Sequence, residues 1–68
     1  MHREFLTLPD GNKIPVREIL NRGYEGIAYQ STSSDKLFLL ELEWRNGGYF
    51  ERVRELSREE FEAWKEKA

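Results

Sequence analysis

Two carboxylates placed two residues apart are the side chains in this sequence best arranged to do chemistry. Glu41 and Glu43 lie in the stretch 36–45, whose alternating pattern predicts a strand, so both would project from one face of a sheet. They would then stand roughly 7 Å apart, within the range that acid–base pairs of glycoside hydrolases use. Such a pair needs one carboxyl with a raised pKa. Because Arg52 and Arg54 on the next strand could pair with both carboxylates, we expect solvated ion pairs here.

The other candidates for catalysis or metal binding are few. The sequence has no Cys and one His, His2, within a terminus (1–4) that we expect to fray. A disulfide and a zinc site built from Cys and His are therefore excluded. Ser31, Ser33 and Ser34 lie in or beside a turn with no His to activate them. We expect no enzyme activity, no cofactor and no bound metal.

A second kind of site would be a stacking platform for single-stranded nucleic acid, made of aromatic and basic side chains. The candidate residues are Tyr24, Tyr29, Tyr49, Phe50, Arg45, Arg52 and Arg54. Glu41, Glu43, Glu51 and Glu55 alternate with these arginines, and the net charge is −2. Neither half of the sequence is basic, so the electrostatic footprint of a nucleic-acid-binding protein is missing. Nucleic-acid binding is kept only as the alternative function.

Length and composition set the frame for the fold. Sixty-eight residues allow one small domain, 1–68, and such a chain buries only about 60% of the surface that its unfolded form exposes. Nine aromatic residues can nevertheless supply a core. No apolar run approaches the roughly 20 residues of a membrane span, and the N-terminus does not resemble a signal peptide. We expect a soluble, cytoplasmic protein with no membrane partner.

The N-terminal part predicts a hairpin followed by an ambiguous segment. Leu8-Pro9-Asp10-Gly11 has the residues of a type I turn followed by a bulge. Pro15 cannot donate a hydrogen bond to a neighbouring strand, so its strand should lie at an edge or end there. Residues 15–22 fit either a helical turn or a continued strand. The spacing of Val16, Ile19 and Leu20 at i, i+3 and i+4 makes the helical turn our preferred reading.

Two further strands are predicted in the middle of the sequence. In the first, Ile27 and Tyr29 share one face, while Gly26 and Ala28 form a small-residue face that another backbone could approach closely. The second, at 36–45, is the strongest strand pattern. Its alternating apolar residues should all face the core: Phe38, Leu40, Leu42 and Trp44.

The next turn contains Asn46, Gly47 and Gly48 and leaves two registers open. With Gly47-Gly48 as the loop, Glu43 faces Arg52 and Glu41 faces Arg54. An Asn46-Gly47 loop keeps the same faces but preserves only the pair of Glu41 with Arg52. We prefer the first register because it matches more charges.

The C-terminus predicts a helix over 57–68. Ser57 and Glu60 form an S-x-x-E capping box, and Leu56 with Phe61 forms the matching hydrophobic staple. Trp64 falls on the same stripe as Phe61 and should pack the helix on the sheet.

These elements predict an α+β fold: a small antiparallel sheet of 4–5 strands in two hairpins, with the C-terminal helix packed on it. The order of the elements resembles that of small SH3-like or OB-like barrels, which implies that the sheet could curl into a partial barrel. No motif of either family accompanies this resemblance.

One apolar cluster could belong either to the core of the domain or to a surface that binds a partner. Leu37, Leu39 and Leu56 gather on the hairpin face opposite the expected core. They could be buried by a curled sheet or a helix of the same chain, which is our preferred reading, or by another chain, including a second copy. We expect a small non-enzymatic protein-interaction module, a regulator or accessory subunit. The partner-binding surface would consist of Leu37, Leu39, Phe50, Arg52, Arg54 and Leu56.

Overall fold

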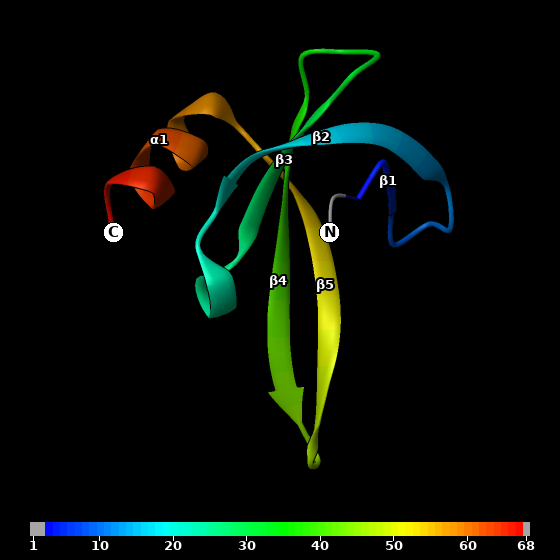
Figure 1. Ribbon diagram of the computed structural model, residues 1–68, viewed down its shortest axis with the longest axis vertical. Coiled ribbons are helices and arrows are strands. Elements are labelled where there is room, and N and C mark those ends of the chain that lie inside the picture. The colour runs from blue at the N-terminus through cyan, green and yellow to red at the C-terminus, as the bar shows by residue number, and fades with distance from the viewer. Residues whose placement is uncertain (1–2, 68) are drawn as a thin grey trace.

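Five antiparallel strands and a C-terminal helix form the described part of the chain, which is residues 3–67 of the computed structural model (Figure 1). The strands lie in the sheet in chain order, so that each pairs with the next. In chain order the elements are β1 Phe5–Thr7, β2 Lys13–Asn21, the 3-10 turn η1 Gly23–Glu25, β3 Ile27–Ser31, β4 Leu37–Arg45, β5 Gly48–Leu56 and α1 Arg58–Glu66. The predicted α+β fold with a sheet curled into a partial barrel is confirmed.

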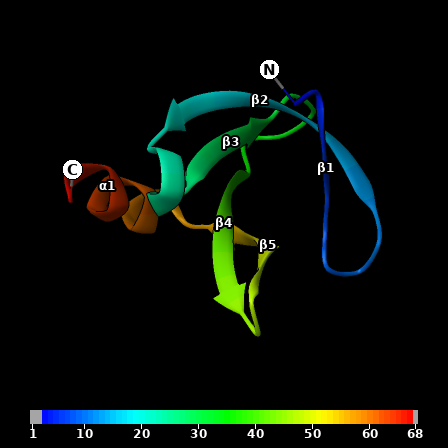
Figure 2. The ribbon, with the colours of Figure 1, turned by 60° about the horizontal axis from the view of Figure 1, so that its bottom comes forward.

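The sheet curls because β2 has two neighbours along its length. Its first residues pair with β1, where Phe5 is opposite Pro15, and the rest pair with β3 from Val16 onward. Figure 2 shows the resulting arch of β2, with β1 turned away from β3, β4 and β5. The prediction that the strand of Pro15 lies at an edge or ends there is wrong. Pro15, which has no N–H to donate, lies within β2 at the point where the partner strand changes from β1 to β3.

The preferred helical turn over 15–22 is also wrong, since these residues continue β2 as far as Asn21. The register with β3 shifts between Glu18 and Leu20, which leaves Ile19 as an extra residue in β2. This bulge explains the misleading spacing. It brings both Ile19 and Leu20 against the cluster beneath α1, so apolar residues recur as they would on a helix.

The first hairpin has the turn that the sequence predicts. The Gly11 N–H donates to the Leu8 carbonyl at 2.9 Å, and the Leu8 N–H donates to the Asn12 carbonyl at 2.8 Å. Asp10 accepts the Asn12 N–H, which fixes the loop from within.

The turn between β4 and β5 corrects the predicted register. Arg45 is opposite Gly48, so the loop is Asn46-Gly47, and both loop residues have positive φ, 46° and 81°. This is the turn whose twist matches that of the flanking strands. Glu41 therefore faces Arg52, as the less favoured register required, and Glu43 faces Phe50. A surface ion pair contributes about 0–1 kcal/mol, which is too little to override the turn.

The C-terminal helix starts as predicted. The Glu60 N–H donates to Ser57 Oγ, and the Ser57 N–H donates to Glu60 Oε1, both at 3.0 Å. At the other end of α1, the partly buried Arg22 guanidinium donates to the Trp64 carbonyl at 2.6 Å and lies over the Trp64 ring. The interaction satisfies a carbonyl at the helix C-terminus and ties α1 to the segment between β2 and η1.

The core has two parts, one on each side of the sheet. An inner cluster lies inside the curl and comprises Leu6, Val16, Tyr29, Phe38 and Leu40. A helix cluster lies between the sheet and α1 and comprises Ala28, Leu37, Leu39, Leu56 and Phe61. Ala28 is fully buried, so the predicted small-residue face of β3 does admit close packing.

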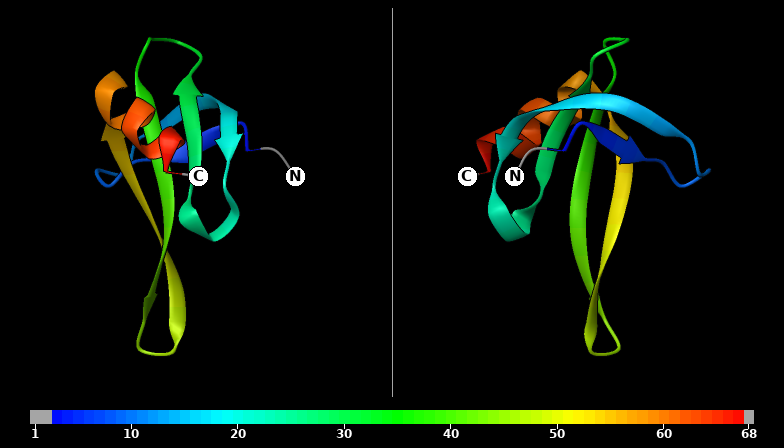
Figure 3. Two further views of the ribbon diagram at one scale, coloured as in Figure 1. Left: turned by 90° about the vertical axis from the view of Figure 1, so that its left-hand side faces the viewer. Right: turned by 45° about the vertical axis from the view of Figure 1, so that its right-hand side comes forward.

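The outer half of the β4–β5 hairpin projects beyond the other strands and the helix (Figure 3). Nine residues in each strand span roughly 30 Å, and the rest of the domain is too small to cover that length. Leu42 and Trp44 are consequently 41% and 60% exposed, so the prediction that they face the core is wrong. The alternation of β4 is real, but only its first half is covered.

The chain before β1 is tied to the sheet. Arg3 pairs with Glu51 of β5, and the Glu4 carbonyl accepts the Val16 N–H at 2.9 Å. Both residues thus make contacts that a frayed terminus would lack. Residues 1 and 2, and with them His2, lie outside the described residues, as does residue 68 at the end of the predicted helix.

Candidate interaction surface

The two carboxylates of β4 are parts of separate surface ion pairs. Glu41 accepts a hydrogen bond from Arg54 Nε at 3.0 Å, and Glu43 accepts one from Arg45 Nε at 3.0 Å. Each carboxylate has its own guanidinium, and both side chains are partly exposed. The predicted pair of Glu41 with Arg54 is present, although Arg52 is the residue directly opposite Glu41. The predicted pair of Glu43 with Arg52 is wrong, because Glu43 is opposite Phe50 and binds Arg45 of its own strand. Arg54 also reaches Glu60 of α1 at 3.4 Å.

The predicted partner-binding set divides into buried and exposed residues. Leu37, Leu39 and Leu56 are at most 4% exposed, because α1 covers them with Phe61 and Trp64. The preferred reading, burial within the same chain, is confirmed, and the assignment of these leucines to a partner surface is wrong. The exposed members are Phe50, Arg52 and Arg54. A binding role for these three stays a prediction.

The aromatic residues of the alternative nucleic-acid platform are also divided. Tyr29 is 1% exposed and belongs to the inner cluster, so it cannot stack on a base. Its burial raises the pKa of the Tyr29 phenol above the ordinary value, and Glu18 and Glu51 add to the effect while Arg3 opposes it. Tyr24, Tyr49 and Phe50 are 81%, 59% and 55% exposed.

Three exposed aromatic rings gather beside the outer half of the hairpin. Trp44 and Tyr49 are directly opposite on β4 and β5, with ring centroids 4.7 Å apart in an edge-to-face arrangement. Tyr24 of η1 stacks against Tyr49 with centroids 6.4 Å apart. Leu42 lies on the same face of β4 as Trp44. We call Tyr24, Leu42, Trp44 and Tyr49 the aromatic surface.

The rings hold one another in place without being buried. Single exposed apolar residues are ordinary on a protein surface, whereas a contiguous group marks an interaction site. Tyr and Trp are the residue types that most often dominate protein–protein contacts, because they bury a large area and lose little side-chain freedom. The geometry therefore suits contact with another macromolecule.

The sequence pattern contained a signal for this surface that alternation alone obscured. Alternation assigns Leu42 and Trp44 to the core and gives Tyr24 no role. The length of the paired strands is the informative quantity. A two-stranded arm of about 30 Å exceeds the size of a small core, so the residues nearest its turn must be exposed on both faces.

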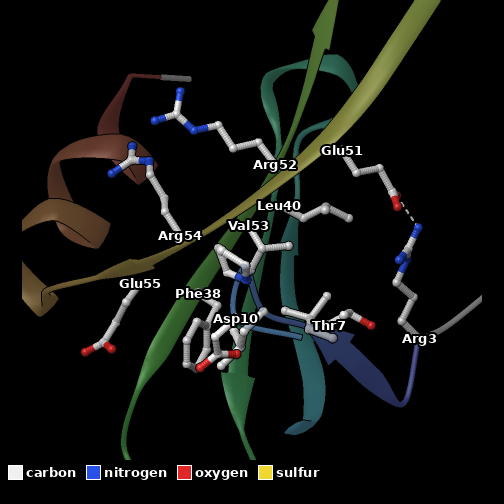
Figure 4. A pocket seen from close by; sticks show the side chains of 13 residues that line it. Arg3, Thr7, Asp10, Phe38, Leu40, Glu51, Arg52, Val53, Arg54 and Glu55 are labelled. Carbon is white, nitrogen blue, oxygen red and sulfur yellow. Dashed lines mark hydrogen bonds and ion pairs between the residues drawn. The ribbon is translucent and has the colours of Figure 1, made fainter. Parts of the chain in front are cut away.

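An open groove lies on the inner side of β5, next to the aromatic surface. Its volume is about 950 Å³, and it lies between β5 and the hairpin of β1 and β2 (Figure 4). The floor comes from the inner cluster, and charged side chains stand along the rim. The residues that line it include Leu6, Phe38, Leu40, Glu51, Arg52 and Val53.

The other candidate residues do not converge on a site. Ser31 Oγ lies 3.1 Å from Ser33 Oγ and accepts the Ser33 N–H, so both hydroxyls belong to the turn after β3. Within residues 3–67, no three side chains of the metal-binding types stand close enough together to hold an ion. None of the helical segments in the same range is long and apolar enough to cross a membrane.

Comparison with known proteins does not add a family to this description. No family model matches the sequence, and neither a curated protein nor a solved structure does. The fold and two features of the hairpin, the aromatic surface and the groove, are therefore the observations that bear on function.

Proposed function

We propose that this chain is a small non-enzymatic, cytoplasmic protein-interaction module that contacts its partner through the projecting β4–β5 hairpin. The observation that supports the proposal is the aromatic surface, in which Trp44, Tyr49 and Tyr24 contact one another and remain largely exposed. A fold of this size gains stability from every apolar side chain that it can bury. Large aromatic rings left outside both core clusters are better explained by a partner than by folding.

The neighbouring charges are balanced, and this favours a protein as the partner. Arg45 is paired with Glu43 and Arg54 with Glu41, so two of the arginines that could bind phosphates are already neutralised. Nucleic-acid binding depends on unpaired cations along the groove that holds the backbone. The hairpin presents aromatic contact area with few free positive charges.

Binding to single-stranded nucleic acid is the second candidate function. The stacked, exposed rings of Tyr24 and Tyr49 favour it, because such rings can stack on bases, whereas Phe50 is exposed on the opposite face of β5. Fluorescence anisotropy with a labelled single strand at low salt separates the two functions. Binding that weakens steeply with added salt would favour the nucleic acid, and no binding at low salt would remove this candidate.

Site-specific photocrosslinking tests the proposed function. A photoreactive amino acid replaces Tyr49 in one version of the protein and Arg17, an exposed residue of β2, in the control. In the native cell, we expect a discrete protein adduct from position 49 and none from position 17. Light scattering on the purified protein tells a second copy from a different protein. Equal yields from the two positions, or no adduct from either, would contradict the proposal.

A further inference from the structure

We propose that the outer edge of β5, together with the groove beside it, binds an extended segment of another protein as an added β-strand, and that apolar and acidic side chains alternate in that segment. This inference specifies the partner's chemistry and rests on the proposed function only in that the partner is a protein. The groove adjoins the aromatic surface, since Glu51 of the groove is opposite Leu42, but none of the four residues of the aromatic surface lines it.

The first observation is the free edge of β5. The strand pairs with β4 along all nine residues, and no other strand within residues 3–67 pairs with its opposite edge. In an antiparallel ladder, every second residue directs its N–H and C=O away from the partner strand. A row of backbone donors and acceptors therefore faces outward along β5, which is a template for another strand.

The second observation is the apolar floor next to that edge. The sheet curls but does not close, so the groove separates β5 from β1. Leu6 and Phe38 lie beneath it, and Val53 is half-buried at its side. A strand added to β5 would direct every second side chain toward this floor. Those positions of the added strand should be apolar.

The third observation is the charge on the other face of β5. Figure 4 shows Arg52 and Arg54 on one side of β5, whereas Glu51 and Val53 point toward the groove. Arg54 is already paired with Glu41 and Glu60. Arg52 is exposed, and the structure gives it no ion pair among the described residues, so it is the cation that an incoming carboxylate would meet. The outward positions of the added strand should therefore be acidic.

Pairing of β5 with the same strand of a second copy is disfavoured by the same charges in the three registers that would pair the most residues. A symmetric antiparallel pair centred on Arg52 places that arginine opposite its own equivalent, and centring on Glu51 does the same with the glutamate. Centring on Val53 places Glu51 opposite the Glu55 of the second copy. Like charges directly opposite each other destabilise a strand pair, so the sequence of β5 favours a different protein.

Selection from a library of short random displayed peptides provides the test. We expect peptides enriched on the wild-type protein to alternate apolar and acidic residues. Arg52→Glu should shift the enriched charge from acidic to basic, and it should weaken binding of a wild-type-selected peptide by about tenfold, which corresponds to about 1.4 kcal/mol. Arg17→Glu, the same change at an exposed arginine of β2, should leave the selection unchanged. Arg52 is exposed, so the variant should fold normally, and its thermal midpoint checks this.

The amide spectrum of the protein with the enriched peptide locates the binding. Slowed hydrogen exchange at alternate residues of β5 would support strand addition. No enrichment, the same charge preference in Arg52→Glu, or perturbation confined to the hairpin turn would overturn the inference. So would formation of a β5-linked dimer. Trp44→Ser separates the two proposals: it should abolish the photocrosslink at position 49 and leave peptide selection intact, so each can fail without the other.

Discussion

Gly26 and Leu39 approach so closely that a β-carbon on Gly26 would stand 3.0 Å from Leu39 Cδ1 and 3.2 Å from the Leu40 carbonyl oxygen. Gly26 also has a φ of 125°, which side-chain-bearing residues rarely adopt. This contact sets the distance between β4 and the segment that leads into β3. It is the point at which the sheet requires a residue without a side chain.

Gly26→Ala should therefore destabilise the protein by about 2–3 kcal/mol, since backbone strain and a steric clash act together. Urea unfolding followed by tryptophan fluorescence measures the change. Gly48→Ala is the matched control, because a β-carbon there meets nothing closer than 4.0 Å. It should change the free energy of unfolding by no more than about 0.5 kcal/mol. Equal effects at the two glycines would refute the role of the close approach.

Leu39 should behave as a core residue and Leu42 as a surface residue, although both lie on β4. Leu39 is fully buried beneath α1, so Leu39→Ala should cost about 2–5 kcal/mol of stability. Leu42→Ala should cost about 0.5 kcal/mol or less, since that side chain is 41% exposed. For the same reason, the double variant that combines Leu39→Ser with Arg54→Glu should fail to fold. If Leu39 belonged to an exposed binding surface, the same variant would fold and lose only its partner. A folded double variant would place the helix cluster in doubt.

Ser57→Ala should weaken α1 by about 1 kcal/mol, because the Glu60 N–H loses its acceptor. The measurement is the urea midpoint at neutral pH. Lys67, beyond the end of the helix, offers a neutral control as Lys67→Ala. An unchanged midpoint in Ser57→Ala would show that the cap does not stabilise the fold.

The same cap predicts acid sensitivity. The backbone N–H of Ser57 is the main cause that lowers the pKa of the Glu60 carboxyl below its ordinary 4.5. Because the pKa of Glu60 is lower in the folded state, the ionised carboxylate stabilises the fold above its pKa in the unfolded state. This stabilisation is lost as the pH falls through the pKa of the folded state. Stability of the wild type should decline on acidification more steeply than that of Glu60→Gln. Parallel acid curves for the two proteins would contradict the assignment.

The burial of Tyr29 predicts that the stability of the protein falls at alkaline pH. Burial raises the pKa of its phenol above 10.0, so the folded state favours the protonated form. The stability that this preference contributes is fully present below the pKa of the phenol in the unfolded state. It is lost as the pH rises through the pKa of the phenol in the folded state. Stability should fall above about pH 10, and Tyr29→Phe should remove that part of the decline. Unfolding curves taken from neutral to strongly alkaline pH test this, and an unchanged slope in Tyr29→Phe would contradict it.

Local signals in the sequence predicted the helix and the first hairpin well. The capping box at Ser57 and the turn at Leu8–Gly11 each depend on hydrogen bonds between residues at most four positions apart. Such interactions are written in a short stretch of sequence and need no knowledge of the rest of the fold. The alternation of β4 likewise predicted its strand correctly.

Features that depend on distant parts of the chain were predicted less well. The bulge at Ile19 imitates helical spacing, and only pairing with β3 shows that the segment is a strand. Matching of charges favours a Gly47-Gly48 loop, whereas the positive φ values of Asn46 and Gly47 show that these two residues form the loop. The aromatic surface was missed because alternation shows which side chains share a face but not whether anything covers that face.

On the proposed function, Trp44 and its neighbours contribute to contact with a partner and not to stability. The most direct measurement is the yield of the photocrosslinked adduct from position 49 in chains with and without Trp44→Ser, with the urea midpoint of each recorded. We predict that the adduct disappears while stability changes by no more than about 0.5 kcal/mol, since Trp44 is 60% exposed. An unchanged adduct, or a loss of stability like that of Leu39→Ala, would contradict the account.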